Sequence, residues 1–218
     1  GRHREAASSF LRAADLRPGS AALMASLGEA LERCGDDEGA ADAYRAAADL
    51  KPDHVSAHAD LGRVLVRLGR AKEGAEACHR ALALDAGHIP GFLGLAAALD
   101  ALGERDAAIA CLEHVIEREA HNTDAHALLC EILDGQDRAD ALRPALARAR
   151  RLCGETDPRI LHLIAQQAHR NGDAATARRY LDRLPEDDAA ARLAKARSGL
   201  VTAIALRAGA GETASTAA

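Results

Sequence analysis

Histidine is the residue type whose number and spacing first suggest chemistry in this chain. The sequence holds ten histidines, among them His54 and His58 four residues apart, and His121 and His126 on either side of Asp124. Imidazole and carboxylate groups bind zinc, but a catalytic zinc site needs three protein ligands and an ordered set of groups around them. We expect no bound metal, because the repeats described below place His58 and His126 at packing positions.

The cysteines do not form a recognisable site either. They are odd in number and include no CxxC pair: Cys34, Cys78, Cys111, Cys130 and Cys153. Neither a disulfide framework nor a zinc site is indicated, which favours reduced thiols in the cytoplasm. Cys78 precedes His79, but adjacent residues point to different sides of a helix, so they do not form a nucleophile–base pair. The chain also lacks a GxSxG motif and a glycine-rich phosphate loop. We therefore predict no catalytic residue, cofactor or enzymatic activity in this chain.

Composition narrows the class of protein. The 218 residues are 48% hydrophobic, enough to bury a sizeable core, and carry a formal net charge of −5. An acidic chain with two Tyr, two Phe and no Trp is unlike nucleic-acid binders, which tend to be basic and to stack bases on aromatic rings. No stretch approaches the roughly 18 apolar residues of a membrane span, and no signal peptide is visible. We predict a cytoplasmic protein without nucleic acid or membrane insertion.

The strongest pattern in the sequence is a 34-residue repeat. The segment LGEALERCGDDEGAADAYRAAADLKPD begins at Leu27, and related segments begin at Leu61 and Leu95. Repeats of about 20–50 residues indicate an array of one small structural unit. The recurring columns are two of leucine (Leu27, Leu61, Leu95, Leu129; Leu31, Leu65, Leu99, Leu133), two of small residues (Gly28, Gly62, Ala96, Cys130; Ala6, Ala40, Gly74, Ala108), one bulkier (Phe10, Tyr44, Cys78, Leu112) and one of turn glycines (Gly1, Gly35, Gly69, Gly103).

Each unit has the pattern of two helices joined by a short turn. Apolar residues fall at helical spacing before and after Gly35, and glycine suits a helix end that needs a positive φ. The small columns let the two helices approach closely, and overpacking such a column costs about 1–3 kcal/mol. One hairpin cannot bury its apolar face alone, so neighbouring hairpins must stack. We therefore predict an all-α solenoid of antiparallel helix–turn–helix repeats.

This pattern resembles the tetratricopeptide repeat (TPR) family, whose signature over 34 residues is W-x₂-L-G-x₂-Y, A-x₃-F and P. The first full unit has M-x₂-L-G-x₂-L from residue 24, A-x₃-Y from residue 40 and Pro52. His58 and His126 stand in the tryptophan column, which in the family points into the hairpin. The resemblance covers residues 1–135 and implies a right-handed solenoid.

The repeat boundaries define the predicted organisation of residues 1–208. Residues 1–18 are expected to be the second helix of a repeat whose first helix is missing, so the chain is an excerpt of a longer protein or this helix serves as a cap. Well-matched repeats span 21–54, 55–88 and 89–122, and degenerate repeats span 123–157 and 158–185. Pro144 predicts a kink, or a helix that restarts there, and Asp157 with Pro158 predicts a new helix start. Residues 186–208 are predicted as a capping helix with one buried face, and 209–218 as a flexible tail.

The resemblance also implies that the first helices line a groove for an extended or helical peptide. Two ways in which the family grips ligands, a Lys/Asn/Arg clamp and an asparagine ladder, are not matched, since Asn122 and Asn171 are the only asparagines. The positions that correspond to the groove are Ala25, Glu29, Glu32, Arg33, Ala59, Arg63, Val66, Arg67, Leu93, Ala97, Asp100, Asp124, Ala127, Glu131, Asp134, Arg159, His162, Gln166 and His169.

Two functional hypotheses follow. The first is a protein-interaction scaffold that binds a peptide or protein segment in this groove. The alternative is a substrate-recruiting arm of a larger bacterial glycosyl-, sulfo- or methyltransferase whose catalytic domain lies outside the chain. Self-association through repeat faces is a third hypothesis. The groove positions run from arginines through an acidic stretch to a weakly basic end, which predicts a ligand with a basic centre and flanks that tolerate acid.

Overall fold

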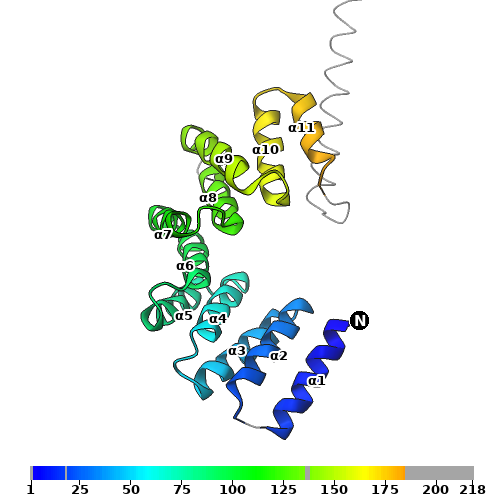
Figure 1. Cartoon of the computed structure of the whole chain (residues 1–218), viewed down its shortest axis with the longest axis vertical. Helices are drawn as coiled ribbons and strands as arrows, with labels where there is room; N and C mark the ends of the chain where they lie inside the picture. The colour runs from blue at the N-terminus through cyan, green and yellow to red at the C-terminus, as the bar shows by residue number, and fades with distance from the viewer. Residues whose placement is uncertain (1, 18, 136–137, 185–218) are drawn as a thin grey trace, which may run out of the picture. The chain divides into compact units, whose positions relative to one another are not determined.

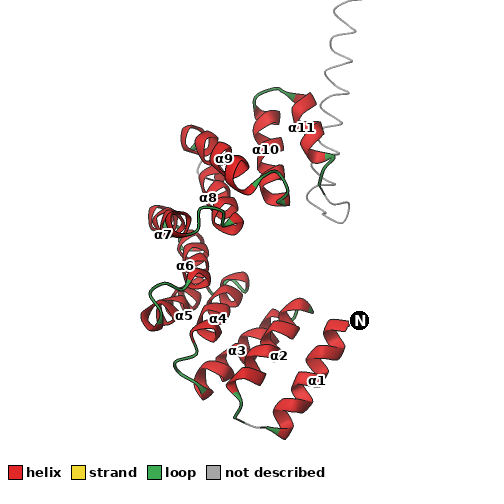
Figure 2. Ribbon diagram, viewed as in Figure 1, coloured by secondary structure: helices red, strands yellow, loops and turns green. Residues whose placement is uncertain are grey.

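The computed structural model describes residues 2–17, 19–135 and 138–184 (Figure 1). Over these ranges the chain forms eleven α-helices and no β-strand (Figure 2). The predicted all-α helical-repeat class is confirmed. The turn glycine predicted at Gly1, the capping helix predicted over 186–208 and the tail predicted over 209–218 lie outside the described residues.

The first compact unit, residues 1–120, contains seven of these helices. Each helix packs on the next one along the chain, and α4 also packs on α6. The hairpins α2–α3, α4–α5 and α6–α7 are therefore consecutive repeats, with α1 packed on α2. The bounds are α1 (Arg2–Leu16), α2 (Ala21–Arg33), α3 (Asp37–Leu50), α4 (Val55–Arg67), α5 (Ala71–Leu84), α6 (Ile89–Ala101) and α7 (Arg105–Arg118).

The second compact unit, residues 121–218, contains the other four described helices. They form the hairpins α8–α9 and α10–α11, and α10 contacts both α8 and α9. Their bounds are α8 (Thr123–Gly135), α9 (Ala139–Cys153), α10 (Pro158–Arg170) and α11 (Ala174–Leu181).

The residues that cap the helix starts recur at the same 34-residue spacing as the packing columns. The first helix of each of four hairpins begins after a side chain that accepts a hydrogen bond from the backbone N–H three residues on: Ser20, His54, His88 and Asn122. These residues are 34 positions apart, and such caps satisfy a backbone donor that the helix leaves free. Asp157 caps α10 in the same way and Pro158 is its first residue, as predicted. The hairpin turns use Gly35, Gly69, Gly103 and Gly172, all with φ between 76° and 82°.

The two helices of a hairpin approach most closely at the small columns. In α2–α3, a Cβ atom added to Gly28 would lie 2.7 Å from the ring of Tyr44. In α4–α5, a Cβ on Gly62 would lie 2.8 Å from the carbonyl oxygen of Gly74 and 2.3 Å from the sulfur of Cys78. Real Cβ atoms do not come this close to other heavy atoms, so these glycines are required by the packing.

The prediction that a helix restarts at Pro144 is wrong. Helix α9 begins at Ala139 and runs through Pro144 to Cys153. The proline removes one hydrogen bond near the helix start, and its side chain is exposed. The buried stripe on α9 compensates for that loss: Leu142, Ala145, Leu146 and Ala149.

Candidate functional site: the face of the first helices

The predicted groove positions lie on α2, α4 and α6 in the first unit and on α8 and α10 in the second. We call these two sets of residues the first-helix face of each unit. Each set is described within its own unit, beginning with the charged side chains, because charges decide which ligands a face attracts.

Glu32 on α2 is the centre of a charged network in the first unit. Its carboxylate accepts hydrogen bonds from both terminal nitrogens of Arg63 on α4, one of them at 2.9 Å. Nη1 of Arg67 lies 2.9 Å from the same carboxylate, and the hydroxyl of Tyr44 on α3 donates to it at 3.2 Å. Glu32 therefore ties three helices of two consecutive repeats together.

Two aspartates extend this network. Asp60 accepts from Arg63 at 3.0 Å, and Asp37, at the start of α3, accepts from Arg67 at 2.7 and 3.1 Å. Three carboxylates thus face two guanidinium groups, so each arginine is shared between carboxylates. Arginine suits this role because its planar fork holds several acceptors at once.

The network sets the protonation state of its members. Burial raises the pKa of Glu32, but the hydrogen bonds and charges of Arg63 and Arg67 outweigh burial and bring that pKa below its ordinary value. The hydrogen bond from Arg67 lowers the pKa of Asp37. The pKa of Asp60 is raised, because burial outweighs its bond to Arg63. The two lowered pKa values favour the charged forms on which the ion pairs depend.

The other predicted positions of the first unit differ in how far a ligand could reach them. Glu29 and Arg33 are exposed and lie 3.9 Å apart, and Asp100 lies 3.5 Å from Arg105. Ala59 is only 2% exposed and packs inside the unit, so a ligand cannot touch it. The partly accessible remainder is mostly apolar or small: Ala25, Val66, Leu93 and Ala97.

In the second unit, α10 supplies arginines that pair with carboxylates of α8. Arg159 donates to Asp124 at 2.6 Å and to Asp157 at 3.0 Å. Arg170 donates to both carboxylate oxygens of Asp134, at 2.5 and 3.0 Å. Two of the four carboxylates predicted to form the acidic stretch are therefore paired with arginine within the second unit.

The remaining positions on α8 and α10 are mixed. The side-chain nitrogens of Gln166 and His162 lie 2.8 Å apart. Glu131 is half-buried, His169 is exposed, and Ala127 is fully buried, so Ala127 cannot contact a ligand.

Sequence reasoning missed the partners that hold the predicted charges. Tyr44 was assigned to a packing column, and the position of its hydroxyl beside Glu32 could not be read from that column. Asp60 precedes Arg63 by three residues, a spacing that brings two side chains together on a helix, so this pair could have been found. Arg170 lies one residue beyond the last predicted position, His169, and had no such signal.

The residues considered as metal ligands or nucleophiles can be checked among the described residues. No group of three or more His, Cys, Asp or Glu side chains in these ranges could hold a metal ion. Burial raises the pKa of Cys78 and of Cys130 to about 12, so both thiols are protonated and unreactive. His58 is buried, with Nε2 2.9 Å from the carbonyl oxygen of Pro52, and His126 is fully buried. Both histidines have the packing role predicted for the tryptophan column.

Comparison with known families identifies the class of this repeat array. Residues 24–153, more than half of the chain, match the family described as the cilia and flagella-associated protein 70 middle TPR-like domain. The chain therefore belongs to this TPR-like family. No curated protein matches the chain. Within the described residues, no helix is long and apolar enough to cross a membrane.

Solved structures of TPR proteins share the fold. A tetratricopeptide repeat protein from Parabacteroides merdae is similar with a TM-score of 0.81 at 12% identity, over 91% of this chain and 78% of that one. A thermophilic TPR protein from Thermus thermophilus, TTC0263, gives a TM-score of 0.73 at 18% identity, over 83% and 100% of the two chains. YrrB, described as a TPR protein with an unusual peptide-binding site, gives 0.57 at 20% identity, over 87% and 99%.

Proposed function

We propose that this chain is a protein-interaction scaffold that binds a peptide or protein segment on its first-helix faces. Membership of a TPR-like family supports this class of function. YrrB, which shares the fold, has a peptide-binding site. That site is a property of YrrB, and we take it as support for peptide binding by this array.

One observation carries the proposal: charged side chains on the face are already held in place before a ligand arrives. Arg63 and Arg67 are 42% and 37% exposed, and both are fixed by Glu32. Side chains that are ordered beforehand lose less conformational freedom on binding, which raises affinity. The partly accessible Leu93 and Ala97 on α6 add apolar surface for a peptide side chain.

The finer proposal concerns the charge of the ligand. Asp100 and Asp124 have side chains that are 37% and 68% exposed, so their pairing with arginine leaves carboxylate surface for a second cation. We therefore propose that a ligand segment on either face has a basic centre and flanks that tolerate acidic residues. Exposed charges are screened within about 10 Å at 0.1 M salt, so binding should weaken as salt rises.

The test compares two double variants of equal charge change. Fluorescent twelve-residue peptides with either a central Arg-Ala-Arg or a central Glu-Ala-Glu are titrated with protein, and fluorescence anisotropy is measured at low and tenfold higher salt. The proposal predicts that Asp100→Lys with Glu131→Lys weakens binding of the basic peptide. The control, Glu117→Lys with Asp182→Lys, changes charge outside the face and should leave binding unchanged. Equal affinity of the two peptides, or equal loss in the two double variants, would contradict the charge assignment.

A further inference from the structure

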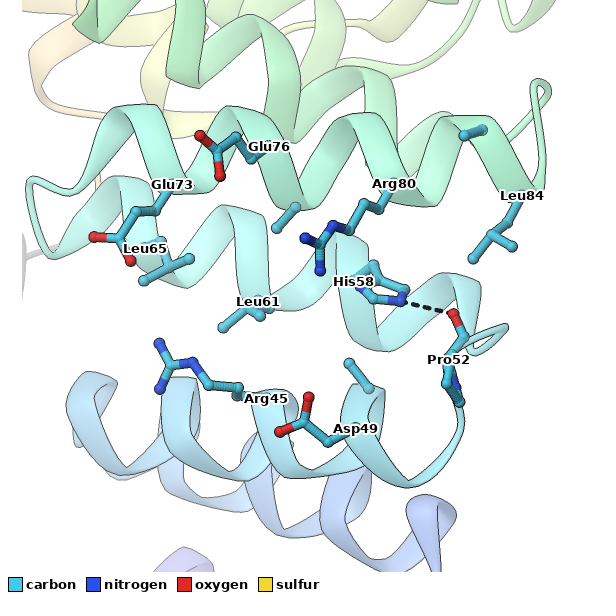
Figure 3. Close-up of a pocket in the computed structure, with 13 residues that line it drawn as sticks. Arg45, Asp49, Pro52, His58, Leu61, Leu65, Glu73, Glu76, Arg80 and Leu84 are labelled. Atoms are coloured by element: carbon cyan, nitrogen blue, oxygen red, sulfur yellow. Dashed lines mark hydrogen bonds between the residues drawn. The ribbon is translucent and has the colours of Figure 1, made fainter.

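The first unit has a concave feature that lies outside the first-helix face. A pocket of about 660 Å³ lies between α3, α4 and α5 (Figure 3). Arg45 and Asp49 point into it from α3, Arg80 points into it from α5, and Leu61 of α4 lies at its floor (Figure 3). Sites for ligands commonly have volumes of about 300–1,000 Å³, so the pocket can hold several side chains of a partner.

The pocket is explained by a comparison with the next repeat. Thirty-four residues after Ala48, His58 and Arg80 stand Leu82, Phe92 and His114. There the rings of Phe92 and His114 have centroids 4.6 Å apart, and Leu82 lies 3.1 Å from a Cβ built on Gly91. Ala48 is three carbon atoms shorter than leucine, and Arg80 has no ring to stack on His58. The pocket and the matching region of the next repeat thus lie at the same repeat positions but are lined by different side chains.

Apolar surface remains at the mouth of the pocket. Leu84 on α5 lines it and is 45% exposed, whereas Leu61 and Leu65 below are 8% and 2% exposed. A large apolar side chain that is left this exposed gains free energy when a partner covers it. The arrangement suits one apolar side chain of leucine size that enters beside Leu84.

The charges around the mouth indicate what should accompany that side chain. Arg45 pairs with Asp42 at 2.8 Å, and Glu73 pairs with Arg70 at 2.6 Å. In the described part of the chain, the other three charged lining residues have no ion-pair partner within 4.0 Å: Asp49, Glu76 and Arg80. Two carboxylates against one guanidinium leave a negative excess, which is complementary to a basic ligand residue.

We propose that this pocket is a second peptide site, which takes a partner segment with a leucine-sized side chain next to a lysine or arginine. The apolar side chain packs against Leu84 over the α4 floor, and the cation lies between Asp49 on α3 and Glu76 on α5. This site lies between second helices and shares no lining residue with the first-helix face. A partner can therefore occupy it independently of the ligand proposed above.

The experiment uses short peptides whose sequence isolates each feature. The ¹⁵N-labelled protein is titrated with acetyl-GSLRSG-amide, and amide shifts are followed by NMR. The same is done with peptides that carry Leu-Glu or Ala-Arg at the centre. The proposal predicts saturable shifts that cluster on α3, α4 and α5 with Leu-Arg, and weaker binding of both other peptides. Absence of saturable shifts, or equal binding of Leu-Glu, would overturn it.

Three variants locate the binding. Leu82 of the next repeat packs against Gly91, whereas Ala48 packs with Ala57 at the matching position. The double variant Ala48→Leu with Ala57→Gly therefore copies the next repeat, should fold for that reason, and should abolish binding by filling the pocket. Asp49→Ala with Glu76→Gln changes only exposed side chains, and should weaken Leu-Arg binding by about fivefold, the scale of surface charge pairs. The face variant Asp100→Lys with Glu131→Lys should leave binding intact, which separates this site from the first-helix face. Binding that survives Ala48→Leu with Ala57→Gly would overturn the proposal. So would shifts on α3 and α5 that depend on protein concentration without peptide, because a second copy would then fill the pocket.

Discussion

The hairpins α2–α3 and α4–α5 achieve the same close approach in physically different ways. In the first, Gly28 makes room for the ring of Tyr44, which is 1% exposed. In the second, Gly62 and Gly74 meet backbone to backbone, because a Cβ on either would lie 2.8 Å from the carbonyl oxygen of the other. A ring can be exchanged for a smaller side chain, whereas a backbone carbonyl cannot. Gly28 and Gly62 occupy the same sequence column, but a Cβ atom is tolerated differently at the two positions.

The largest expected effect is that of Gly62→Leu. The new side chain would collide with the Gly74 carbonyl and with Cys78, so α4 and α5 must move apart. We expect a loss of about 3 kcal/mol in unfolding free energy, the upper end of the usual overpacking cost. Urea unfolding followed by circular dichroism at 222 nm measures it, with the exposed position Ala110→Leu on α7 as the control. Equal midpoints for the two variants would show that the helices do not depend on this contact.

A double-mutant cycle sharpens the comparison between the two hairpins. Gly28→Ala places a methyl group against the Tyr44 ring and should cost about 1–2 kcal/mol. Adding Tyr44→Leu recreates the Ala96 and Leu112 pair of the next-but-one repeat, so the double variant should be less destabilised than the sum by about 1 kcal/mol.

The matching cycle in the second hairpin should show no such rescue. Cys78→Ala removes the sulfur but leaves the Gly74 carbonyl in place, so Gly62→Ala should remain costly. A rescue of similar size in both hairpins would refute the distinction between a ring and a backbone contact.

A smaller effect is expected where the two hairpins are joined by charge. Glu32→Gln removes the carboxylate that binds Arg63 and Arg67, and should cost about 1 kcal/mol at pH 7, since the pairs are partly exposed. The pKa of Glu32 is lower in the folded chain than in the unfolded one, so its stabilisation is present above about pH 4.5 and is lost as the pH falls through the folded value. Asp37 acts in the same direction and Asp60 in the opposite one.

Urea unfolding between pH 7 and pH 3 checks this prediction. Glu32→Gln should lose less stability on acidification than the unaltered chain, and Glu29→Gln, at an exposed neighbouring site, should behave like the unaltered chain. Parallel acid profiles for the unaltered chain and Glu32→Gln would mean that the network does not stabilise the fold.

The smallest expected effect is that of Arg33→Ala. Arg33 and Glu29 are 62% and 60% exposed and lie 3.9 Å apart, and such pairs contribute little because water and salt screen them. The change in unfolding free energy should stay within about 0.5 kcal/mol. A larger loss than for Glu32→Gln would mean that burial does not separate the two kinds of ion pair.

The fold could be predicted because the residues that form and end each helix lie within the same repeat. The leucine columns, Gly35 and Pro52 act within a few residues of the structures they cause. The pairing of Glu32 with Arg63 could not be predicted, since it depends on how α2 and α4 lie across an interval of 31 residues. The predicted restart at Pro144 was wrong because the effect of a proline depends on how many helical residues precede it. The sequence does contain a difference that relates to the pocket, since Ala48 stands where the next repeat has Leu82. Only the structure shows that this difference accompanies a pocket.

The helix caps differ in chemistry from one repeat to the next. His54 and His88 cap α4 and α6 through Nδ1, which must be unprotonated to accept a hydrogen bond. Loss of a cap costs about 1 kcal/mol. Ser20 and Asn122, at the same position in the repeats before and after these two, accept through an oxygen atom instead. The starts of two successive repeats therefore each depend on the tautomer of one imidazole ring, whereas the starts of the repeats before and after them do not.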